Sequence, residues 1–184
     1  KIVLLYKNSK NEVYFNKSKI NIIPNPIEIE KFYKKNKIKV NNLPLQILTI
    51  SRLDKNKGID WLINAYHTIK LNTNLKVELT IAGDGPERVN LEKYILEKNI
   101  FGINFVGFVE DVSVLLEKAD IFILPSKFES LPLSIIEALS YGLPIIATDT
   151  GGVNELVTNK KNGFLINYKD TDAIVNAINT LLND

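Results

Sequence analysis

The sequence predicts an α/β domain built on a doubly wound parallel sheet with Rossmann-like topology. From about Gln46 onward, short apolar runs of strand length alternate with segments of helical periodicity. Such β–α order, joined by right-handed crossovers, produces a parallel sheet with helices on both faces. The 184 residues are also enough for one domain with a sizeable core. Ligands of such sheets bind at the carboxyl ends of the strands.

Each expected element corresponds to one apolar or periodic segment. The run 121–124 is apolar throughout and is bounded by Pro125, as is typical of a strand buried on both faces. Pro132 and the apolar positions after it predict a helix that begins between Ser130 and Pro132. The other expected strands are 46–51, 76–82, 104–107, 144–148 and 163–166, and the other expected helices are 58–71, 87–98, 112–118 and 170–182.

The first 45 residues have a different pattern. Residues 1–6 and 21–23 are strand-like, and residues 34–42 are polar, as in a linker. Residues 1–40 contain ten lysines and three glutamates. A solvated surface is the ordinary interpretation of such a segment, and weak contact with an anionic membrane surface is the alternative. No apolar run approaches the roughly 18 residues of a membrane span, and no signal peptide is visible.

The composition excludes several classes of function. A hydrophobic content of 45% and a charged content of 24% are those of an ordinary globular protein, and a net charge of +2 argues against a nucleic-acid binder. The chain has no cysteine, which excludes disulfides, thiolate zinc sites and cysteine nucleophiles. Because His67 is the only histidine, neither a Ser-His triad nor a histidine metal cluster can be assembled.

Two carboxylates, Glu129 and Glu137, stand eight positions apart across a strand–loop–helix junction. The free N–H groups at the start of a helix face an anion, and a carboxylate further along can accept two hydrogen bonds from a vicinal diol. A nucleoside diphosphate sugar offers both a pyrophosphate and a ribose. The junction therefore predicts a sugar-nucleotide site.

Arg52 and Lys57 follow the first strand of the predicted sheet, and Arg52 is one of only two arginines in the chain. Both side chains are cations, and the pyrophosphate of a sugar nucleotide is an anion. A guanidinium can hold two phosphate oxygens at once and an ammonium adds a point charge, which together can replace a metal ion.

An ordered series of motifs resembles the retaining GT-B glycosyltransferases of group 1, which carry an E-x7-E motif in their C-terminal domain. The resemblance covers roughly residues 20–184. It rests on Ser51–Gly58, Ala82–Glu87, Val106–Val109, Glu129–Glu137, Tyr141–Ala147 and Thr150–Leu156, which stand in the order of the family.

The resemblance implies that the chain is the C-terminal half of a GT-B fold. Residues 1–42 would be the end of the N-terminal domain and the interdomain linker, and residues 43–184 the nucleotide-sugar (donor) binding domain. In the family, a further N-terminal domain supplies the acceptor contacts and a glycine-rich loop. We therefore expect that the isolated chain transfers sugar weakly or not at all.

The resemblance also implies roles for individual residues. Arg52, Lys57 and Glu129 would be catalytic, with Glu129 on the donor-sugar hydroxyls, and Glu137 would hold the ribose. The other expected donor contacts are Ser130, Leu131, Leu133, Gly83, Gly85, Gly107, Phe108 and Val109. Many members of the family read Glu-Gly-Phe-Gly-Leu where this chain has Glu129-Ser130-Leu131-Pro132-Leu133. Because Pro132 has no N–H, one backbone donor is missing.

Several alternatives stay open at this point. A glycosidase pair is disfavoured, since its carboxylates must flank the scissile bond from opposite sides. A GT-B sugar-nucleotide epimerase and a non-catalytic nucleotide-binding domain remain. Gly83–Gly85 is equally well interpreted as a tight turn. Asp170-Thr171-Asp172 spells a D-x-D metal motif, but it precedes the last helix, where an N-cap is the ordinary explanation.

The function expected is that of a retaining, metal-independent glycosyltransferase. It would move a hexose from a UDP- or GDP-sugar to a glycan or lipid-linked acceptor, in polysaccharide biosynthesis. No cofactor and no metal are expected, because the nucleotide-sugar is itself a substrate. The expected location is the cytoplasm, with a peripheral contact at the inner face of the membrane as a further possibility.

Overall fold

The computed structural model describes residues 2–4, 20–22, 44–72 and 76–183. The predicted linker and the predicted domain boundary between residues 42 and 43 lie outside the described residues. Within the first 43 residues, β1 (Ile2–Leu4) and β2 (Ile20–Ile22) pair in parallel as a separate two-stranded sheet. These two strands overlap the strand-like segments expected from the sequence.

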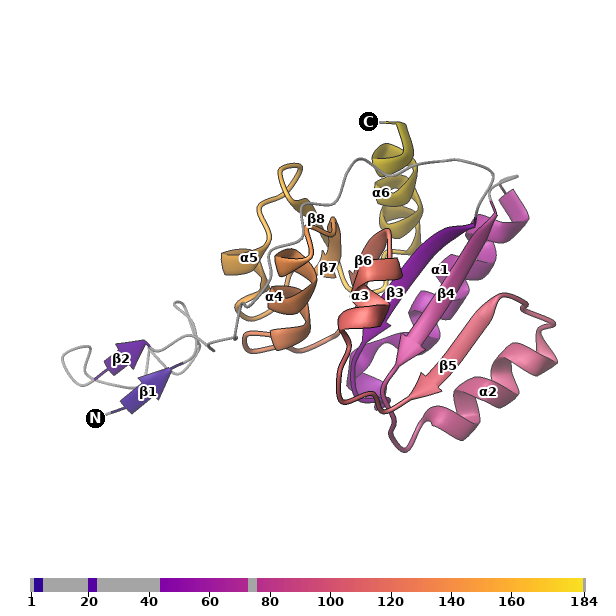
Figure 1. Ribbon diagram of the computed structural model, residues 1–184, viewed down its shortest axis with the longest axis horizontal. Helices are drawn as coiled ribbons and strands as arrows, with labels where there is room; N and C mark the ends of the chain where they lie inside the picture. Colours follow the sequence, from indigo (N-terminus) through magenta and orange to yellow (C-terminus); the bar gives the residue numbers. More distant parts are fainter. Residues whose placement is uncertain (1, 5–19, 23–43, 73–75, 184) are drawn as a thin grey trace.

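The main sheet is parallel and has six strands in the order β5-β4-β3-β6-β7-β8 (Figure 1). This arrangement confirms the predicted α/β fold. β6 and β7 are buried at every position, as expected for strands covered on both faces. The strands are β3 (Leu45–Ile50), β4 (Val77–Ala82), β5 (Ile103–Gly107), β6 (Ile121–Leu124), β7 (Ile145–Thr148) and β8 (Gly163–Ile166).

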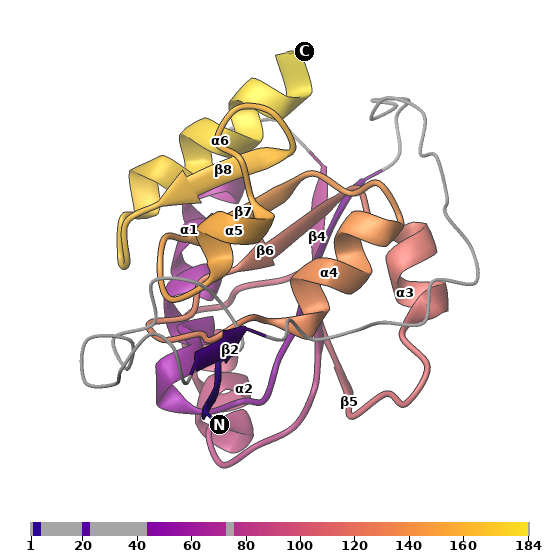
Figure 2. The same cartoon turned by 90° about the vertical axis from the view of Figure 1, so that its left-hand side faces the viewer.

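Helices cover both faces of the sheet (Figure 2). The first face carries α1 (Ile59–Asn72), α2 (Arg88–Glu97) and α6 (Thr171–Asn183), whose apolar residues form one core with the sheet. The second face carries α3 (Ser113–Lys118), α4 (Leu133–Ser140) and α5 (Val153–Leu156), which form the other. None of the helices that the structure describes has the length and apolar character needed to cross a bilayer.

The strand order reverses between β3 and β6. These two strands are neighbours in the sheet, although β4 and β5 separate them in the sequence. β4 and β5 extend the sheet on one side, and β7 and β8 extend it on the other. In open parallel sheets, the crevice at such a reversal, outside the carboxyl ends of the strands, is where ligands bind. The loops after β3 and β6 lie at this reversal.

Two local details differ from the sequence-based expectation. α4 begins at Leu133, not at residues 130–132, and Pro132 is its extended N-cap with φ −72° and ψ 119°. A proline ring disfavours helical backbone at the residue before it, here Leu131, which excludes a start before Pro132, and the extended ψ of Pro132 itself places the first helical residue at Leu133. The 3-10 turn η3 (Lys55–Lys57) was not expected, because three residues are too short to show a helical period.

The N-cap interpretation of Asp170 is confirmed. Its Oδ1 accepts a hydrogen bond of 2.9 Å from the Ala173 N–H, in the first turn of α6. Trp61 is a core residue, and its Nε1 donates to Thr171 Oγ1 at 3.0 Å. The start of α6 is thereby joined to α1.

Candidate active site

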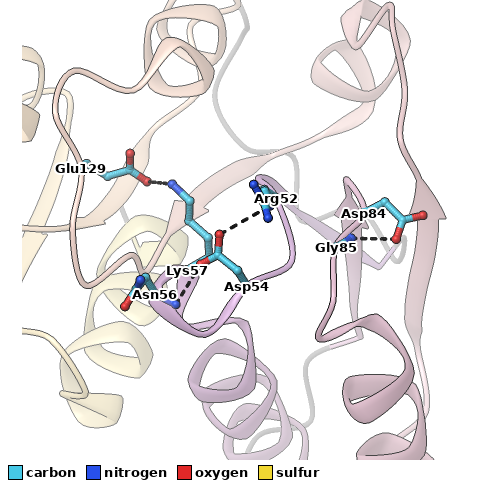
Figure 3. Close-up of polar contacts among 7 residues, drawn as sticks. All are labelled: Arg52, Asp54, Asn56, Lys57, Asp84, Gly85 and Glu129. Atoms are coloured by element: carbon cyan, nitrogen blue, oxygen red, sulfur yellow. Dashed lines mark hydrogen bonds and ion pairs between the residues drawn. The ribbon is translucent and has the colours of Figure 1, made fainter.

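The loops that follow β3 and β6 interlock at the reversal point of the sheet. The Lys127 N–H, after β6, donates to the Asn56 carbonyl at 2.7 Å. Beside this contact, Lys57 Nζ lies 2.7 Å from Glu129 Oε1 (Figure 3). The structure therefore brings together two of the three residues predicted to be catalytic.

The sequence around Lys57 explains why its side chain faces the loop that follows β6. Asp54 Oδ1 accepts from the Asn56 N–H at 3.0 Å, and the Asp54 carbonyl accepts from the Lys57 N–H at 3.0 Å. These bonds close the 3-10 turn η3, which ends at Gly58 in the left-handed region. An aspartate that caps its own turn, followed by a glycine that stops it, fixes the direction of the lysine between them.

The Lys57–Glu129 pair is largely shielded from water. The two side chains are only 23% and 11% exposed. A charge-assisted hydrogen bond in such surroundings is stronger than a surface ion pair. Because an ammonium has three N–H donors, Lys57 can hold Glu129 and still donate to an anionic ligand.

Arg52 lies between this pair and the turn after β4 in the view of Figure 3. Its side chain is 72% exposed, and its nearest carboxylate oxygen, Asp54 Oδ2, is 3.8 Å from Nε. The guanidinium is therefore held loosely and can turn toward a ligand. Its backbone is firmly placed, because the flanking Ser51 and Leu53 N–H groups donate to Ala82 and Asp84 carbonyls at 3.0 and 2.9 Å.

Gly83 and Gly85 allow the β4–α2 turn to approach the backbone around Arg52. A Cβ at Gly83 would stand 1.9 Å from the Ser51 carbonyl oxygen, and one at Gly85 would stand 2.3 Å from that of Leu53. Close backbone packing is thus sufficient to explain both glycines, as the tight-turn interpretation proposed. A contact between this turn and a donor stays a prediction.

Glu137 lies on α4, in the helix that follows the Glu129 loop, and its side chain is half-buried. Burial raises the pKa of its carboxyl group above the ordinary value of 4.5. Within the part of the chain that the structure describes, its carboxylate has no hydrogen-bond partner, although its carbonyl accepts from Ser140 Oγ at 2.6 Å. Among the described residues, the ion pairs of Arg52 and Lys57 are with Asp54 and Glu129, and none is with Glu137.

The remaining predicted donor contacts lie either at the start of α4 or at the end of β5. Ser130 and Leu133 are exposed at the start of α4, whereas the Leu131 side chain is buried. Gly107 is joined to Gly83, whose N–H donates to its carbonyl at 2.7 Å. The two residues after Gly107 differ in exposure: Phe108 is 79% exposed and Val109 is intermediate.

A third loop, after β7, supports the Glu129 loop from the other side. Thr150 Oγ1 donates to the Lys127 carbonyl at 3.1 Å, and the Gly152 N–H donates to the Ser130 carbonyl at 2.6 Å. The Glu129 loop is therefore fixed between two neighbours, the loops after β3 and β7. Such support restricts the movement of the loop that carries Glu129.

Sequence reasoning missed Arg88, the second of the two arginines. Its Nη1 lies 3.1 Å from Asp84 Oδ2 and its Nε lies 2.9 Å from Glu92 Oε1. The available signal was its rarity in a lysine-rich chain and its place directly after the Gly83–Gly85 turn. Reasoning from the sequence also missed the hydroxyls of Ser51 and Ser126, which are buried without a hydrogen-bond partner among the described residues.

No three His, Cys, Asp or Glu side chains converge as metal ligands among residues 44–72 and 76–183. Independence of the reaction from metal stays a prediction, since it concerns the complete site with its substrate.

Comparison with known proteins is consistent with this geometry. A family model described as "Glycosyl transferases group 1" matches residues 30–184. An uncharacterized glycosyltransferase of Haemophilus influenzae is 36% identical over 143 residues, which are 75% of this chain and 39% of that protein. The UDP-Gal:alpha-D-GlcNAc-diphosphoundecaprenol alpha-1,3-galactosyltransferase of Escherichia coli is 32% identical over 200 residues, 100% of this chain and 51% of that protein.

Among solved structures, the sucrose-phosphate synthase of Thermosynechococcus elongatus is similar, with a TM-score of 0.82 and 27% identity. The match covers 99% of this chain and 49% of that chain. The chain thus spans about half, or less, of the length of the proteins it matches.

Proposed function

The chain belongs to the glycosyl transferases group 1 family, and on this basis we propose that it binds the donor of a retaining, metal-independent hexosyltransferase. The donor would be a UDP- or GDP-sugar, and the acceptor a glycan or a lipid-linked glycan. A second domain, N-terminal to this one, would supply the acceptor contacts.

The observation that carries the proposal is the ion pair between Lys57 and Glu129 at the reversal point of the sheet. It sets an ammonium and a carboxylate side by side where open parallel sheets bind ligands. Arg52 stands on the same loop as Lys57, with a guanidinium exposed to solvent. A site with two cations and one carboxylate suits a ligand that carries both phosphates and hydroxyls.

In the proposed reaction, the bond between the sugar anomeric carbon and the diphosphate oxygen breaks, the acceptor hydroxyl oxygen bonds to that carbon, and the proton of the hydroxyl passes to the released diphosphate. The leaving diphosphate takes up negative charge, which Arg52 and Lys57 would stabilise. Glu129 would hold hydroxyls of the donor sugar, and Glu137 would accept hydrogen bonds from the two ribose hydroxyls. Retention of the anomeric configuration is what the family resemblance implies.

The name of one relative supports transfer to a lipid-linked acceptor. The Escherichia coli relative is named for a UDP-galactose donor and a diphosphoundecaprenol acceptor. We propose the same class of reaction for the complete protein, at the cytoplasmic face of a membrane. Transfer is preferred to epimerisation because the relatives compared above are named as transferases or synthases.

Titration calorimetry of the chain with UDP and with GDP tests the donor site. We expect heat of binding for one of the two nucleotides and loss of that heat in the double variant Arg52→Ala, Lys57→Ala. Lys55→Ala, on the exposed side of the same turn, is the matched control. Absence of binding for both nucleotides would contradict the proposal.

A further inference from the structure

We propose that Arg88 is a positioning residue for the nucleoside end of the donor. Its guanidinium joins the β4–α2 turn to the end of β5 and so fixes the direction of Phe108. The inference rests on the proposed function, because Phe108 is taken as a contact of the nucleotide base.

The first part of the evidence is the set of contacts around the guanidinium. Nη1 binds Asp84 Oδ2 at 3.1 Å, and Nε binds Glu92 Oε1 at 2.9 Å. The other oxygen of Asp84, Oδ1, accepts from the Gly85 N–H at 2.7 Å. Both oxygens of the Asp84 carboxylate are therefore engaged, one by its own turn and one by Arg88.

The ionised state of this carboxylate is favoured by its partners. The Gly85 N–H and then the Arg88 guanidinium lower the pKa of Asp84 below its ordinary value of 3.8. The contact between turn and arginine is therefore charge-assisted at neutral pH.

The second part of the evidence is the position of the guanidinium over the end of β5. A Cβ built on Gly107 would stand 3.1 Å from Arg88 Nη1, so the arginine lies against the backbone at that residue. The Gly107 carbonyl accepts from the Gly83 N–H at 2.7 Å, which joins the same strand end to the same turn. Arg88 thus adds a side-chain contact between the β4–α2 turn and the end of β5, which the hydrogen bond between Gly83 and Gly107 already joins.

The third part of the evidence is the direction in which the chain leaves β5. The register of β4 and β5 shifts between Ile81, paired with Phe105, and Ala82, paired with Gly107. Val106 is the extra residue of this bulge, and Gly107 adopts a φ of +74°. Bulges of this kind re-aim the following side chain. Here the following side chain is Phe108, which is 79% exposed.

Magnitudes favour a positioning role over a role in stability. The Arg88, Asp84 and Glu92 side chains are 30%, 55% and 41% exposed, and both pairs are of the i, i+4 kind. Exposed pairs of this kind contribute little to stability, because solvent screens them. Geometry depends on them more strongly, because the planar guanidinium donates to Asp84 and Glu92 in fixed directions, whereas a lysine ammonium is a compact charge without that fixed fork of donors.

The test compares Arg88→Ala and Arg88→Lys with wild type by calorimetry, using UDP or GDP, whichever wild type binds, and inorganic pyrophosphate. We expect both variants to lose roughly three- to tenfold in nucleotide affinity. Pyrophosphate affinity and melting temperature should stay at wild-type values. Lys93→Ala, which removes the exposed Lys93–Glu97 pair of the same helix, is the matched control and should change neither affinity.

A double-mutant cycle with Phe108→Ala identifies the route of the effect. If Arg88 acts through Phe108, the Arg88→Ala change should cost little affinity once Phe108 has been removed. Unchanged nucleotide affinity in both Arg88 variants overturns the inference, as does an equal loss for nucleotide and pyrophosphate, or additive losses in the cycle. If Arg88→Ala fails to fold, the nucleotide and pyrophosphate affinities of Arg88→Lys alone test the inference. Wild-type chain that binds neither nucleotide overturns the proposed function as well.

Discussion

Lys57 and Glu129 form an ion pair of 2.7 Å although 72 positions separate them in the chain. The contact crosses the boundary between β3 and β6, the two strands at which the order of the sheet reverses. It therefore joins the two halves of the sheet at the place where a ligand of this fold is expected. The pair is at once a structural link and the centre of the candidate site.

Breaking this pair should destabilise the fold. We expect Lys57→Met and Glu129→Gln each to lower the free energy of unfolding by about 1–3 kcal/mol, because each leaves a poorly solvated charge without its partner. The double variant should lose less unfolding free energy than the two single variants added together. The difference, which is the coupling energy of the pair, should be roughly 0.5–3 kcal/mol. Urea unfolding measures all four proteins.

Lys93→Met and Glu97→Gln, in the exposed Lys93–Glu97 pair, serve as the control. The free energy of unfolding of each should stay within about 0.5 kcal/mol of the wild-type value. Additive losses at Lys57 and Glu129 would show that the two side chains do not interact in solution.

Glu137→Gln should stabilise the folded chain while weakening nucleotide binding. Burial raises the pKa of Glu137, so the folded state holds its proton to higher pH than the unfolded state does. Ionisation of Glu137 therefore reduces stability above about pH 4.5, and removing the charge should raise the free energy of unfolding at pH 7. The difference between variant and wild type should vanish as the pH falls below 4.

Loss of the charged acceptor for the ribose diol should weaken nucleotide binding roughly tenfold or more. Unfolding at pH 7 and pH 4, together with calorimetry, measures both effects. Glu117→Gln, on the exposed side of α3, is the control. A variant that is more stable but binds nucleotide as wild type does would remove Glu137 from the site.

Arg52→Ala should reduce kcat far more than it raises KM in an enzyme that contains both domains. The guanidinium would meet the diphosphate most strongly when the bond to the sugar is breaking, so its loss affects the transition state. The expected loss is about 10²- to 10³-fold in kcat. Steady-state kinetics with varied donor measures the split, and Lys55→Ala controls for charge in the same loop. A raised KM with unchanged kcat would assign Arg52 to ground-state binding alone.

Tyr66→Phe should destabilise the chain by about 1–2 kcal/mol. The buried hydroxyl lies 3.0, 3.1 and 2.9 Å from the carbonyls of Val77, Phe101 and Gly102. It thus holds α1 to the chain that enters β4 and β5. Tyr94→Phe is the control, since that hydroxyl bonds to Asn64 Oδ1 at an exposed position.

The same variant should change the response to alkaline pH. Burial, with a smaller effect of Glu78, raises the pKa of Tyr66 from 10.0 to about 12. The folded state therefore keeps a proton that the unfolded state loses, and stability falls as the pH rises from 10 toward 12. The difference in unfolding free energy between wild type and Tyr66→Phe should shrink over this range. A constant difference would mean that Tyr66 titrates normally in the fold.

Much of the fold could be predicted because its signals are local. Each buried strand is an apolar run, and each longer helix has its own period and boundary residues, as Asp170 illustrates for α6. Prediction failed where competing local signals were close together. Pro132 indicated a helix start, but its ring disfavours helical backbone at Leu131, and Pro132 itself is the extended N-cap, so the helix begins at Leu133.

The sequence by itself determined that Arg52, Lys57 and Glu129 each follow a strand, and hence that all three lie at one edge of a parallel sheet. Only the tertiary structure decided that β3 neighbours β6, which sets Lys57 against Glu129. It also decided that the bulge between β4 and β5 brings Gly107 under Arg88. The physical reason is that strand pairing and register depend on packing across the whole sheet, and no short segment of sequence encodes them.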